Sequence, residues 1–217
     1  MDFKRLFSFL RELNKNNSKE WMDEHRKEYH HIRDSYILWL NELDIKLANV
    51  DEDYAPTEGR KAINRINNNL MFHPNKPIYK DHFGAGLDDK PEKGDFYIHI
   101  GINGSFVAGG FYRPKKSILD SIRSAIDYNG DEFKEIIEKE SFVKTFGGLV
   151  DDEKLKTAPK GFSKDHQHIE LLRNKTFAVQ VDLTQKQILK KDFQVILVEI
   201  YREMLPFRNY LNKAITV

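Results

Sequence analysis

The sequence has 217 residues, of which 40% are hydrophobic and 12% aromatic, enough to form a sizeable core. Its 35 basic residues are balanced by 34 acidic ones, so the chain lacks the overall positive charge that favours nucleic acid or an anionic membrane. Cysteine is absent, which excludes disulfides, thiolate catalysis, cysteine-ligated zinc sites and iron–sulfur clusters.

The N-terminal residues carry no apolar segment of the signal-peptide type. No stretch of the sequence approaches the ~20 consecutive apolar residues of a membrane-spanning helix. We therefore expect a cytoplasmic protein with no membrane partner.

Two amphipathic helices are predicted at the start of the chain. Apolar residues within Phe3–Leu13 recur every three or four positions, the period of a helix with one buried face. Asn17 followed by Glu20 has the pattern of a capping box and predicts the start of a second helix. The apolar and aromatic positions of Trp21–Leu47 keep the helical period, so we interpret this stripe as a core face rather than a cofactor site.

A polar connection at Asp51–Gly59 separates these helices from the next predicted element. We expect a strand within Lys61–Leu70. Residues 71–86 contain prolines and glycines and follow no clean period, so they are predicted to form an ordered loop.

A β-hairpin is predicted at about residues 96–112. Apolar and polar residues alternate along this stretch, and Asn103-Gly104 between the two runs is a strong turn signal because both residues accept positive φ. A turn centred on these two residues places His99 opposite Ala108. Small residues opposite larger ones would leave space above this face for a helix or a ligand.

The rest of the chain is predicted to be mostly helical. Pro114 opens a helix that Asn129 and Gly130 stop, and Asp131 caps another. The remaining predicted elements are a loop-rich stretch at residues 145–165, a short helix from Asp165 to Leu172, a strand at Phe177–Leu183, a capping box at Thr184 and Gln187, and a last helix from Phe193 to Met204 that Pro206 kinks or restarts.

Together these elements predict an α+β fold, in which an antiparallel sheet is built around the hairpin at about residues 96–112 and packed by N-terminal and C-terminal helices. The sequence contains no internal repeat, low-complexity tract or flexible linker. We therefore predict a single domain over residues 1–217.

The segment Arg60–Gly86 is the best candidate for a functional site. It carries five basic residues and one acid, a local charge of +4 in a nearly neutral chain. Its asparagines add amide donors and acceptors, and His73 and His82 can titrate near neutral pH. Guanidinium, ammonium and amide groups bind phosphate or carboxylate. A solvated basic loop in which the asparagines form turns is the competing interpretation.

Other kinds of site have little support in the sequence. The eight histidines show no His-Glu-x-x-His or similar spacing, and we interpret them as scattered surface residues; the rings of His166 and His168 would diverge at a helix start. We expect no metal and no cofactor. Nucleophile-elbow, Walker A and Rossmann patterns are absent, so no catalytic residue is predicted and the question of enzyme activity stays open.

An ordered series of motifs runs through nearly the whole chain. They are Phe9-Leu10, Asn16-Asn17, Glu20-Trp21, Arg65-Ile66, Phe72, Lys76, Tyr79-Lys80, Gly109-Gly110, Pro114, Leu155-Lys156, Pro159-Lys160-Gly161-Phe162, Asp165-His166 and Glu170-Leu171-Leu172-Arg173. This order resembles the microbial family called domain of unknown function 2461 (DUF2461). The resemblance implies a single domain and brings no established activity.

The central motif of that family resembles Arg-Ile-x-Arg-Asp-x-Arg-Phe-x-x-Asp-Lys-x-Pro-Tyr-Lys. The matching positions are Arg65, Phe72, Lys76, Tyr79 and Lys80. The departures are Asn68 and Met71 in place of arginines, Asn69 and Asn75 in place of aspartates, and Pro77 one position early. If the family site acts through those aspartates, the chain has an altered or lost activity. If the charged array is structural, neutral hydrogen bonds replace its ion pairs.

Three functions are compatible with the segment. The favoured one is binding of a small phosphate- or carboxylate-bearing ligand, with the segment folded over the hairpin face. Its candidate binding residues are Arg65, Lys76, Tyr79, Lys80, His99 and Arg113. The second is a nucleic-acid-associated module in which Phe72, Tyr79 and Phe83 stack on bases, which the net charge disfavours. The third is a scaffold or interaction protein with no small-molecule site.

Overall fold

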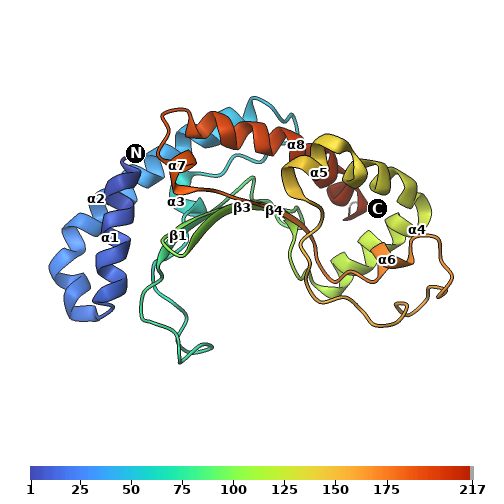
Figure 1. Ribbon diagram of the computed structural model, residues 1–217, viewed down its shortest axis with the longest axis horizontal. Helices are drawn as coiled ribbons and strands as arrows, with labels where there is room; N and C mark the ends of the chain where they lie inside the picture. Colours follow the sequence, from blue (N-terminus) through green and yellow to red (C-terminus); the bar gives the residue numbers. More distant parts are fainter. Residues whose placement is uncertain (216–217) are drawn as a thin grey trace. The chain divides into compact units, whose positions relative to one another are not determined.

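The computed structural model describes residues 1–215 (Figure 1). Its helices are α1 (Phe3–Lys15), α2 (Lys19–Ala48), α3 (Gly59–Ala62), α4 (Lys116–Glu138), α5 (Glu140–Phe146), α6 (Ile169–Leu172), α7 (Gln185–Ile188) and α8 (Phe193–Ile215), and its strands are β1 (His82–Leu87), β2 (Phe96–Gly101), β3 (Gly104–Phe111) and β4 (Phe177–Asp182). Among the described residues, no helix is both long and apolar enough to cross a membrane.

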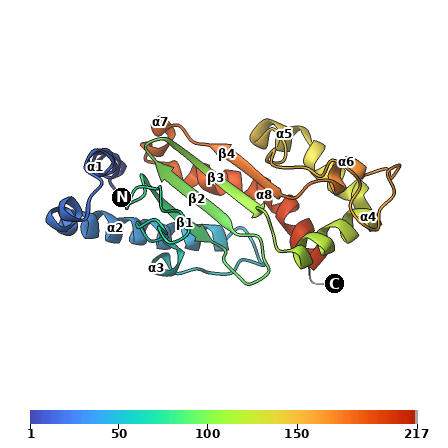
Figure 2. The same ribbon diagram turned by 90° about the horizontal axis from the view of Figure 1, so that it is seen from below.

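The four strands form one antiparallel sheet in the order β1-β2-β3-β4 (Figure 2). The hairpin β2–β3 lies at its centre, and helices precede and follow the sheet along the chain, which confirms the predicted α+β class. Ile98, Ile100 and Val107 are fully buried, whereas His99 is partly exposed, so one face of the hairpin belongs to the core.

The turn of the hairpin lies one residue earlier than predicted. β2 ends at Gly101 and β3 begins at Gly104, so Ile102 and Asn103 are the two residues between the strands. Neither Ile102 nor Asn103 has a positive φ, whereas Gly104, the residue that follows them, has a φ of 144°. A two-residue turn centred on Asn103-Gly104 would need positive φ at both positions, whereas a turn followed by one such glycine needs it once.

This shift of the turn changes which side chains face each other across the hairpin. His99 stacks on Phe106, with ring centroids 4.6 Å apart, instead of facing Ala108. The predicted pairing of His99 with a small residue is therefore wrong. A cavity of about 420 Å³ is nevertheless lined by His99, Phe106 and Leu183.

The described chain divides into two compact units, each made of three stretches of sequence. The first comprises Met1–Asp89, Tyr97–Val107 and Asp182–Val198, and the second comprises Lys90–Phe96, Ala108–Val181 and Glu199–Val217. Both units are discontinuous, because the chain passes from one to the other five times: after Asp89 and within β2, β3, β4 and α8. A single domain over residues 1–217 stays a prediction.

In the first unit, α1 and α2 confirm the two predicted amphipathic helices. The cap of α2 is Ser18 rather than the predicted Asn17: the Ser18 hydroxyl accepts a hydrogen bond from the backbone N–H of Trp21 at 3.2 Å. Ser18 has the extended backbone of an N-cap, and Asn17 is engaged elsewhere. The predicted core face of α2 is buried at Ile32, Tyr36, Leu40, Leu43 and Leu47.

The stretch Lys61–Leu70 is not a strand, which corrects the prediction. It begins inside α3 and then pairs only at isolated bridges, Ile63 with Ala85 and Asn67 with Tyr79. Its asparagine side chains compete for backbone partners, which works against a continuous ladder.

The strand β1 lies where a loop was expected. Its glycines hid the strand signal, since glycine is depleted in strands. Gly84 is needed here because a Cβ at this position would collide with the hydroxyl of Tyr97 on β2.

In the second unit, the predicted break between two helical stretches is confirmed at Asn129. This residue has non-helical φ and ψ (−145° and 58°) inside α4. Fully buried aromatic side chains form the core of this unit: Phe133, Phe142, Phe177 and Phe207.

Among the C-terminal elements, the capping box and the strand are confirmed, whereas the short helix begins later than predicted. The Thr184–Gln187 capping box is present at α7, and β4 lies at the predicted strand. The short helix predicted from Asp165 begins only at Ile169, and Pro206 lies within α8.

Candidate functional site

The basic segment of the first unit forms a long, hairpin-like extension from Ile63 to His82. Its two arms are joined by backbone hydrogen bonds from Lys80 to Ile66 and from Asn68 to Ile78, at 2.8–2.9 Å, and a bond from Asn64 to Gly84 on β1 closes its base at 2.8 Å. The Asn68 amide also donates to the carbonyl of Pro77 at 2.8 Å. An amide that stands in place of a family arginine therefore closes the two arms with a neutral hydrogen bond.

Tyr79 is held by Asn17, from the connection between α1 and α2. The Asn17 amide donates to the carbonyl of Tyr79 at 3.0 Å and its oxygen accepts from the N–H of Tyr79 at 2.9 Å. The Tyr79 side chain is buried, and its phenol contributes to the electrostatic environment of Lys19 and Arg26 on α2. Tyr79 is thus a packing residue that anchors the extension.

Lys80, directly after Tyr79, lies near two other predicted cations, Arg65 and Lys76. The Lys80 ammonium donates to the carbonyl of Arg65 at 2.8 Å. Partial burial, together with the nearby charges of Arg65 and Lys76, lowers the pKa of Lys80 below its ordinary range. Within residues 1–215, none of these three cations makes an ion pair with a carboxylate. The cluster is therefore a group of three cations without an ion-pair partner among the described residues.

Histidines on neighbouring strands lie beside this cluster. The rings of His82 on β1 and His99 on β2 stack with centroids 3.9 Å apart, and Phe106 on β3 continues the stack. Burial, with smaller contributions from His82 and Lys80, lowers the pKa of His99 to about 4. His99 is therefore neutral at physiological pH, and Lys80 lies close enough to affect it.

Asp81 connects the extension to the hairpin turn. It accepts from the ring Nδ1 of His82 at 2.9 Å and from the amide of Asn103 at 2.6 Å. Partial burial alone would raise the pKa of Asp81, but these hydrogen bonds outweigh that effect and lower it. Asp81 is thus a carboxylate near neutral pH whose two oxygens are already engaged.

Four of the six predicted binding residues therefore belong to one neighbourhood of the first unit: Arg65, Lys76, Lys80 and His99. Tyr79 supports that neighbourhood through its backbone. Arg113 belongs to the second unit, where its guanidinium makes two 2.8 Å hydrogen bonds to Asp152.

Two residues of the neighbourhood were not among the predicted binding residues. Asp81 was counted only as the single acid of the segment, and His82 only as a group that titrates near neutral pH. Their importance depends on strand pairing, which the sequence did not reveal because β1 was not predicted.

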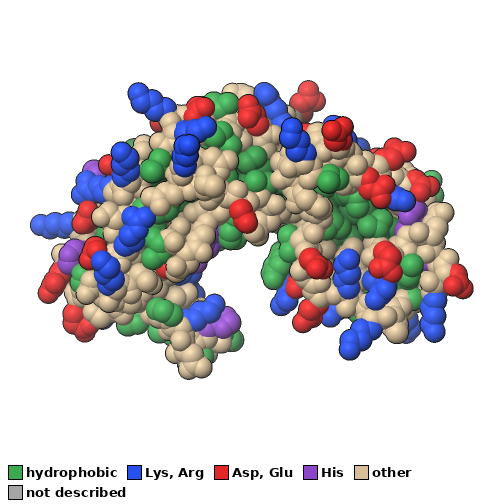
Figure 3. Space-filling view, viewed as in Figure 1, with side chains coloured by type: hydrophobic (Ala, Val, Ile, Leu, Met, Phe, Trp, Pro, Cys, Tyr) green, Lys and Arg blue, Asp and Glu red, His purple; other side chains and the backbone are tan. Residues whose placement is uncertain are grey.

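The tip of the extension exposes apolar side chains. Met71 is 78% and Phe72 69% exposed, and Lys76 and His73 follow within four residues. In Figure 3, basic and histidine side chains lie beside hydrophobic ones on the loop that Figure 1 draws in teal. Of the three rings expected to stack on nucleic-acid bases, only Phe72 is exposed, because Tyr79 and Phe83 are buried.

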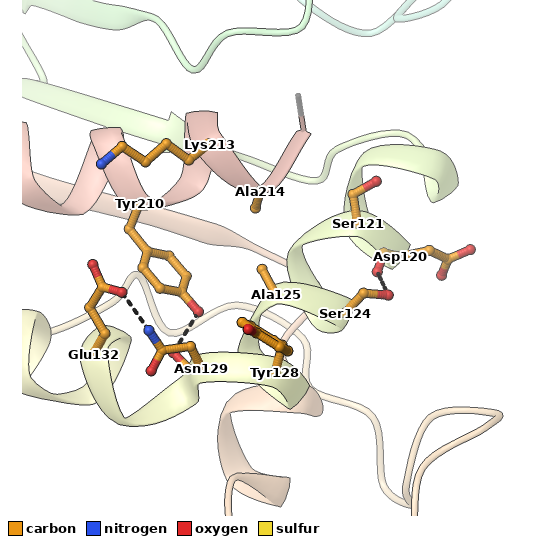
Figure 4. Close-up of a pocket in the computed structure, with 10 residues that line it drawn as sticks. All are labelled: Asp120, Ser121, Ser124, Ala125, Tyr128, Asn129, Glu132, Tyr210, Lys213 and Ala214. Atoms are coloured by element: carbon orange, nitrogen blue, oxygen red, sulfur yellow. Dashed lines mark hydrogen bonds between the residues drawn. The ribbon is translucent and has the colours of Figure 1, made fainter. Parts of the chain in front are cut away.

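The second unit contains a separate cavity of about 630 Å³ (Figure 4). It lies between α4 and the C-terminal part of α8, where the Tyr210 hydroxyl donates to the carbonyl of Asn129 at 3.0 Å. The Asn129 amide is in turn bonded to Glu132 at 2.6 Å. This hydrogen-bonded set explains how the break in α4 is held.

His166 and His168 differ from the expected surface histidines. His168 is buried against Gly130, where a Cβ would collide with its ring, and the ring Nδ1 of His166 accepts from the His168 N–H at 3.0 Å. The ring Nε2 of His166 lies 2.9 Å from Asp127. Within the described part of the chain, no group of three or more histidine and acidic side chains is arranged to hold a metal ion.

The fold is that of an α+β protein with a four-stranded antiparallel sheet, and the extension that precedes β1 carries the three cations. The model of the family described as "Conserved hypothetical protein (DUF2461)" matches residues 5–210, so the chain belongs to that family. No curated protein and no solved structure matches the chain.

Proposed function

We propose that the protein binds a small ligand bearing a phosphate or carboxylate group through Arg65, Lys76 and Lys80. The observation that carries the proposal is a geometric one: the Lys80 ammonium donates to the carbonyl of Arg65 at 2.8 Å, and within residues 1–215 none of Arg65, Lys76 and Lys80 makes an ion pair with a carboxylate. Burial and the charges of Arg65 and Lys76 lower the pKa of Lys80, which supports it. Like charges held together in this way destabilise one another. A bound anion would remove that repulsion.

The three cations offer complementary donors. The planar guanidinium of Arg65 can make two parallel hydrogen bonds to one anionic group, and the ammonium groups add point charges. A hydrogen bond to a charged group contributes about 1.5–3 kcal/mol, so two or three of them support binding of a small ligand.

Asp81 makes no ion pair with these three cations within residues 1–215. Its two oxygens accept from His82 and Asn103, so the acid of the segment holds the hairpin turn while keeping its charge.

A thermal-shift screen with phosphate, nucleotides and small organic acids at low salt tests the proposal. We expect at least one anion to raise the melting temperature of the wild-type protein. Arg65→Ala and Lys80→Ala should each remove most of that increase. Lys61→Ala is the matched control, because Lys61 lies in the same segment but is exposed and paired with Glu58.

If an anion stabilises the wild type and both cation variants equally, the site lies elsewhere. If no anion stabilises the wild type, the proposed function is wrong and a scaffold role is favoured. Steeply salt-dependent binding of single-stranded nucleic acid without any small-anion effect would instead favour the nucleic-acid module.

A further inference from the structure

The cavity of about 630 Å³ in the second unit shares no residue with the proposed anion site, which belongs to the first unit. Ser121, Ala125 and Tyr128 are spaced by four and three positions, so α4 presents them on one face. Ala214 faces Ala125 from the C-terminal part of α8 (Figure 4). The small side chains leave open the space between the two helices that larger ones would fill. The volume is typical of a small-molecule site, about 300–1,000 Å³.

Two tyrosines give this cavity an aromatic lining. Tyr210 is 8% exposed, and its hydroxyl donates to the carbonyl of Asn129 at 3.0 Å. The phenol oxygen can therefore still accept a hydrogen bond from a ligand. Tyr128 lines the same cavity but is 93% exposed, so most of its ring surface is in water. Both rings gain contact area when an apolar or aromatic group enters the cavity.

Three charged residues also line the cavity, and one of them has a partner. Asp120 accepts from the ammonium of Lys116. Glu132 accepts from the Asn129 amide at 2.6 Å, but an amide is neutral and does not offset the charge of the carboxylate. Lys213 is the third charged residue. Within residues 1–215, neither Glu132 nor Lys213 makes an ion pair, so the cavity offers one free charge of each sign.

The charge of Glu132 acts close to the buried end of the cavity. Burial, with a smaller contribution from Glu132, raises the pKa of Tyr210 to about 12. The carboxylate and the phenol oxygen are joined through Asn129, which bonds to both (Figure 4). A cationic donor at this position would meet two acceptors, the Glu132 carboxylate and the phenol oxygen of Tyr210.

We propose that this cavity binds a free amino acid with an apolar or aromatic side chain. The ammonium group of the ligand pairs with Glu132, its carboxylate pairs with Lys213, and its side chain contacts Tyr128 and Tyr210. A ligand with a single charge would leave one of the two charged residues without a partner, whereas a zwitterion supplies a partner to each. This inference is independent of the proposed anion-binding function.

Calorimetric titration with L-phenylalanine and two analogues tests the inference. Phenethylamine lacks the carboxylate and 3-phenylpropionate lacks the ammonium group, while all three share the same aromatic group. At about pH 7 each compound carries the charges that its groups imply. We expect phenylalanine to bind at least about 10-fold more tightly than either analogue, because each charged group adds a hydrogen bond to an ionised partner. L-Leucine should also bind, since its side chain is apolar.

Two charge variants assign the ends of the ligand. Glu132→Gln should weaken phenylalanine and phenethylamine about 10-fold and leave 3-phenylpropionate unchanged. Lys213→Met should weaken phenylalanine and 3-phenylpropionate and leave phenethylamine unchanged. Glu135→Gln is the matched control, because Glu135 is an exposed carboxylate of α4 that does not line the cavity. Ala125→Leu fills part of the cavity and should abolish binding of all three compounds.

Phenethylamine or 3-phenylpropionate binding as tightly as phenylalanine would overturn the assignment of a zwitterion. Phenylalanine binding that is the same in the wild type, Glu132→Gln and Ala125→Leu would overturn the location. Binding of neither phenylalanine nor leucine to the wild type would overturn the inference as a whole. Each of these results leaves the proposed anion site standing, because that site is tested with other ligands and other variants.

Discussion

The side chain of Asn17 makes two hydrogen bonds to the backbone of Tyr79, one as donor at 3.0 Å and one as acceptor at 2.9 Å. The pair joins the connection between α1 and α2 to the basic extension, 62 residues further along the chain. The position of Lys80, the next residue, depends on this anchor.

Replacement of Asn17 by alanine should therefore destabilise the first unit. Two partly buried backbone groups of Tyr79 would lose their partners, and we expect a loss of about 2 kcal/mol in the free energy of unfolding. Urea denaturation followed by circular dichroism measures it. Asn67→Ala is the control, because Asn67 is exposed and pairs only through its backbone; equal effects of both changes would contradict the anchor.

Gly84→Ala should destabilise the protein, because its methyl group would collide with the hydroxyl of Tyr97. We expect a cost of about 1–3 kcal/mol, typical of overpacking. The double variant Gly84→Ala/Tyr97→Phe removes the colliding oxygen and should recover part of the loss. A double-mutant cycle from denaturation midpoints with no coupling between the two positions would refute this contact.

The lowered pKa of His99 should make stability depend on pH. The unfolded chain binds a proton at this histidine below about pH 6.5, whereas the folded protein binds it only near pH 4. The unfolded state thus holds more protons in this interval, and stability falls as the pH decreases through it. We expect the free energy of unfolding to fall by about 1 kcal/mol. This is less than the whole shift in the pKa of His99 implies, because the ring is partly exposed.

The variant His99→Phe tests the origin of that loss. Its ring can occupy the position between His82 and Phe106 and does not titrate. Thermal melts between about pH 7 and pH 4 should show a smaller decrease for the variant than for the wild type. Parallel decreases would mean that His99 does not contribute.

In the second unit, Arg113 and Asp152 should contribute stability that depends on pH in the same direction. The guanidinium holds the pKa of Asp152 well below its usual range. The contribution is present above the unfolded value of about 3.9 and is lost as the pH falls through the folded value. The gap in melting temperature between wild type and Asp152→Asn should therefore narrow as the pH is lowered below about 4; a constant gap would contradict this account.

Local patterns in the sequence predicted the helices and the central hairpin well. The apolar period of α2 and the break at Asn129 follow directly from side-chain spacing and backbone preference. The register of the hairpin turn did not follow from local patterns. Asn103-Gly104 suits more than one turn type, and the turn type depends on how the two strands pair.

The candidate site was predicted only in part for a related reason. The concentration of cations predicts Arg65, Lys76 and Lys80 as binding residues, and this stays a prediction. Asp81 and His82 gained importance only through β1, which glycines disguised as a loop. Arg113 was grouped with them by residue type, whereas the folded chain gives it a partner of its own in Asp152.

The pKa of the Lys80 ammonium tests the central claim most directly. Its Cε resonance can be followed by NMR during pH titration, with Lys80→Arg used for assignment, in the absence and presence of methyl phosphate. The account predicts that the pKa of Lys80 lies below the reference value of a lysine side chain, about 10.4, and that methyl phosphate shifts its titration upward. A Lys80 resonance that titrates at or above that reference value, and does not move when the anion is added, would contradict it.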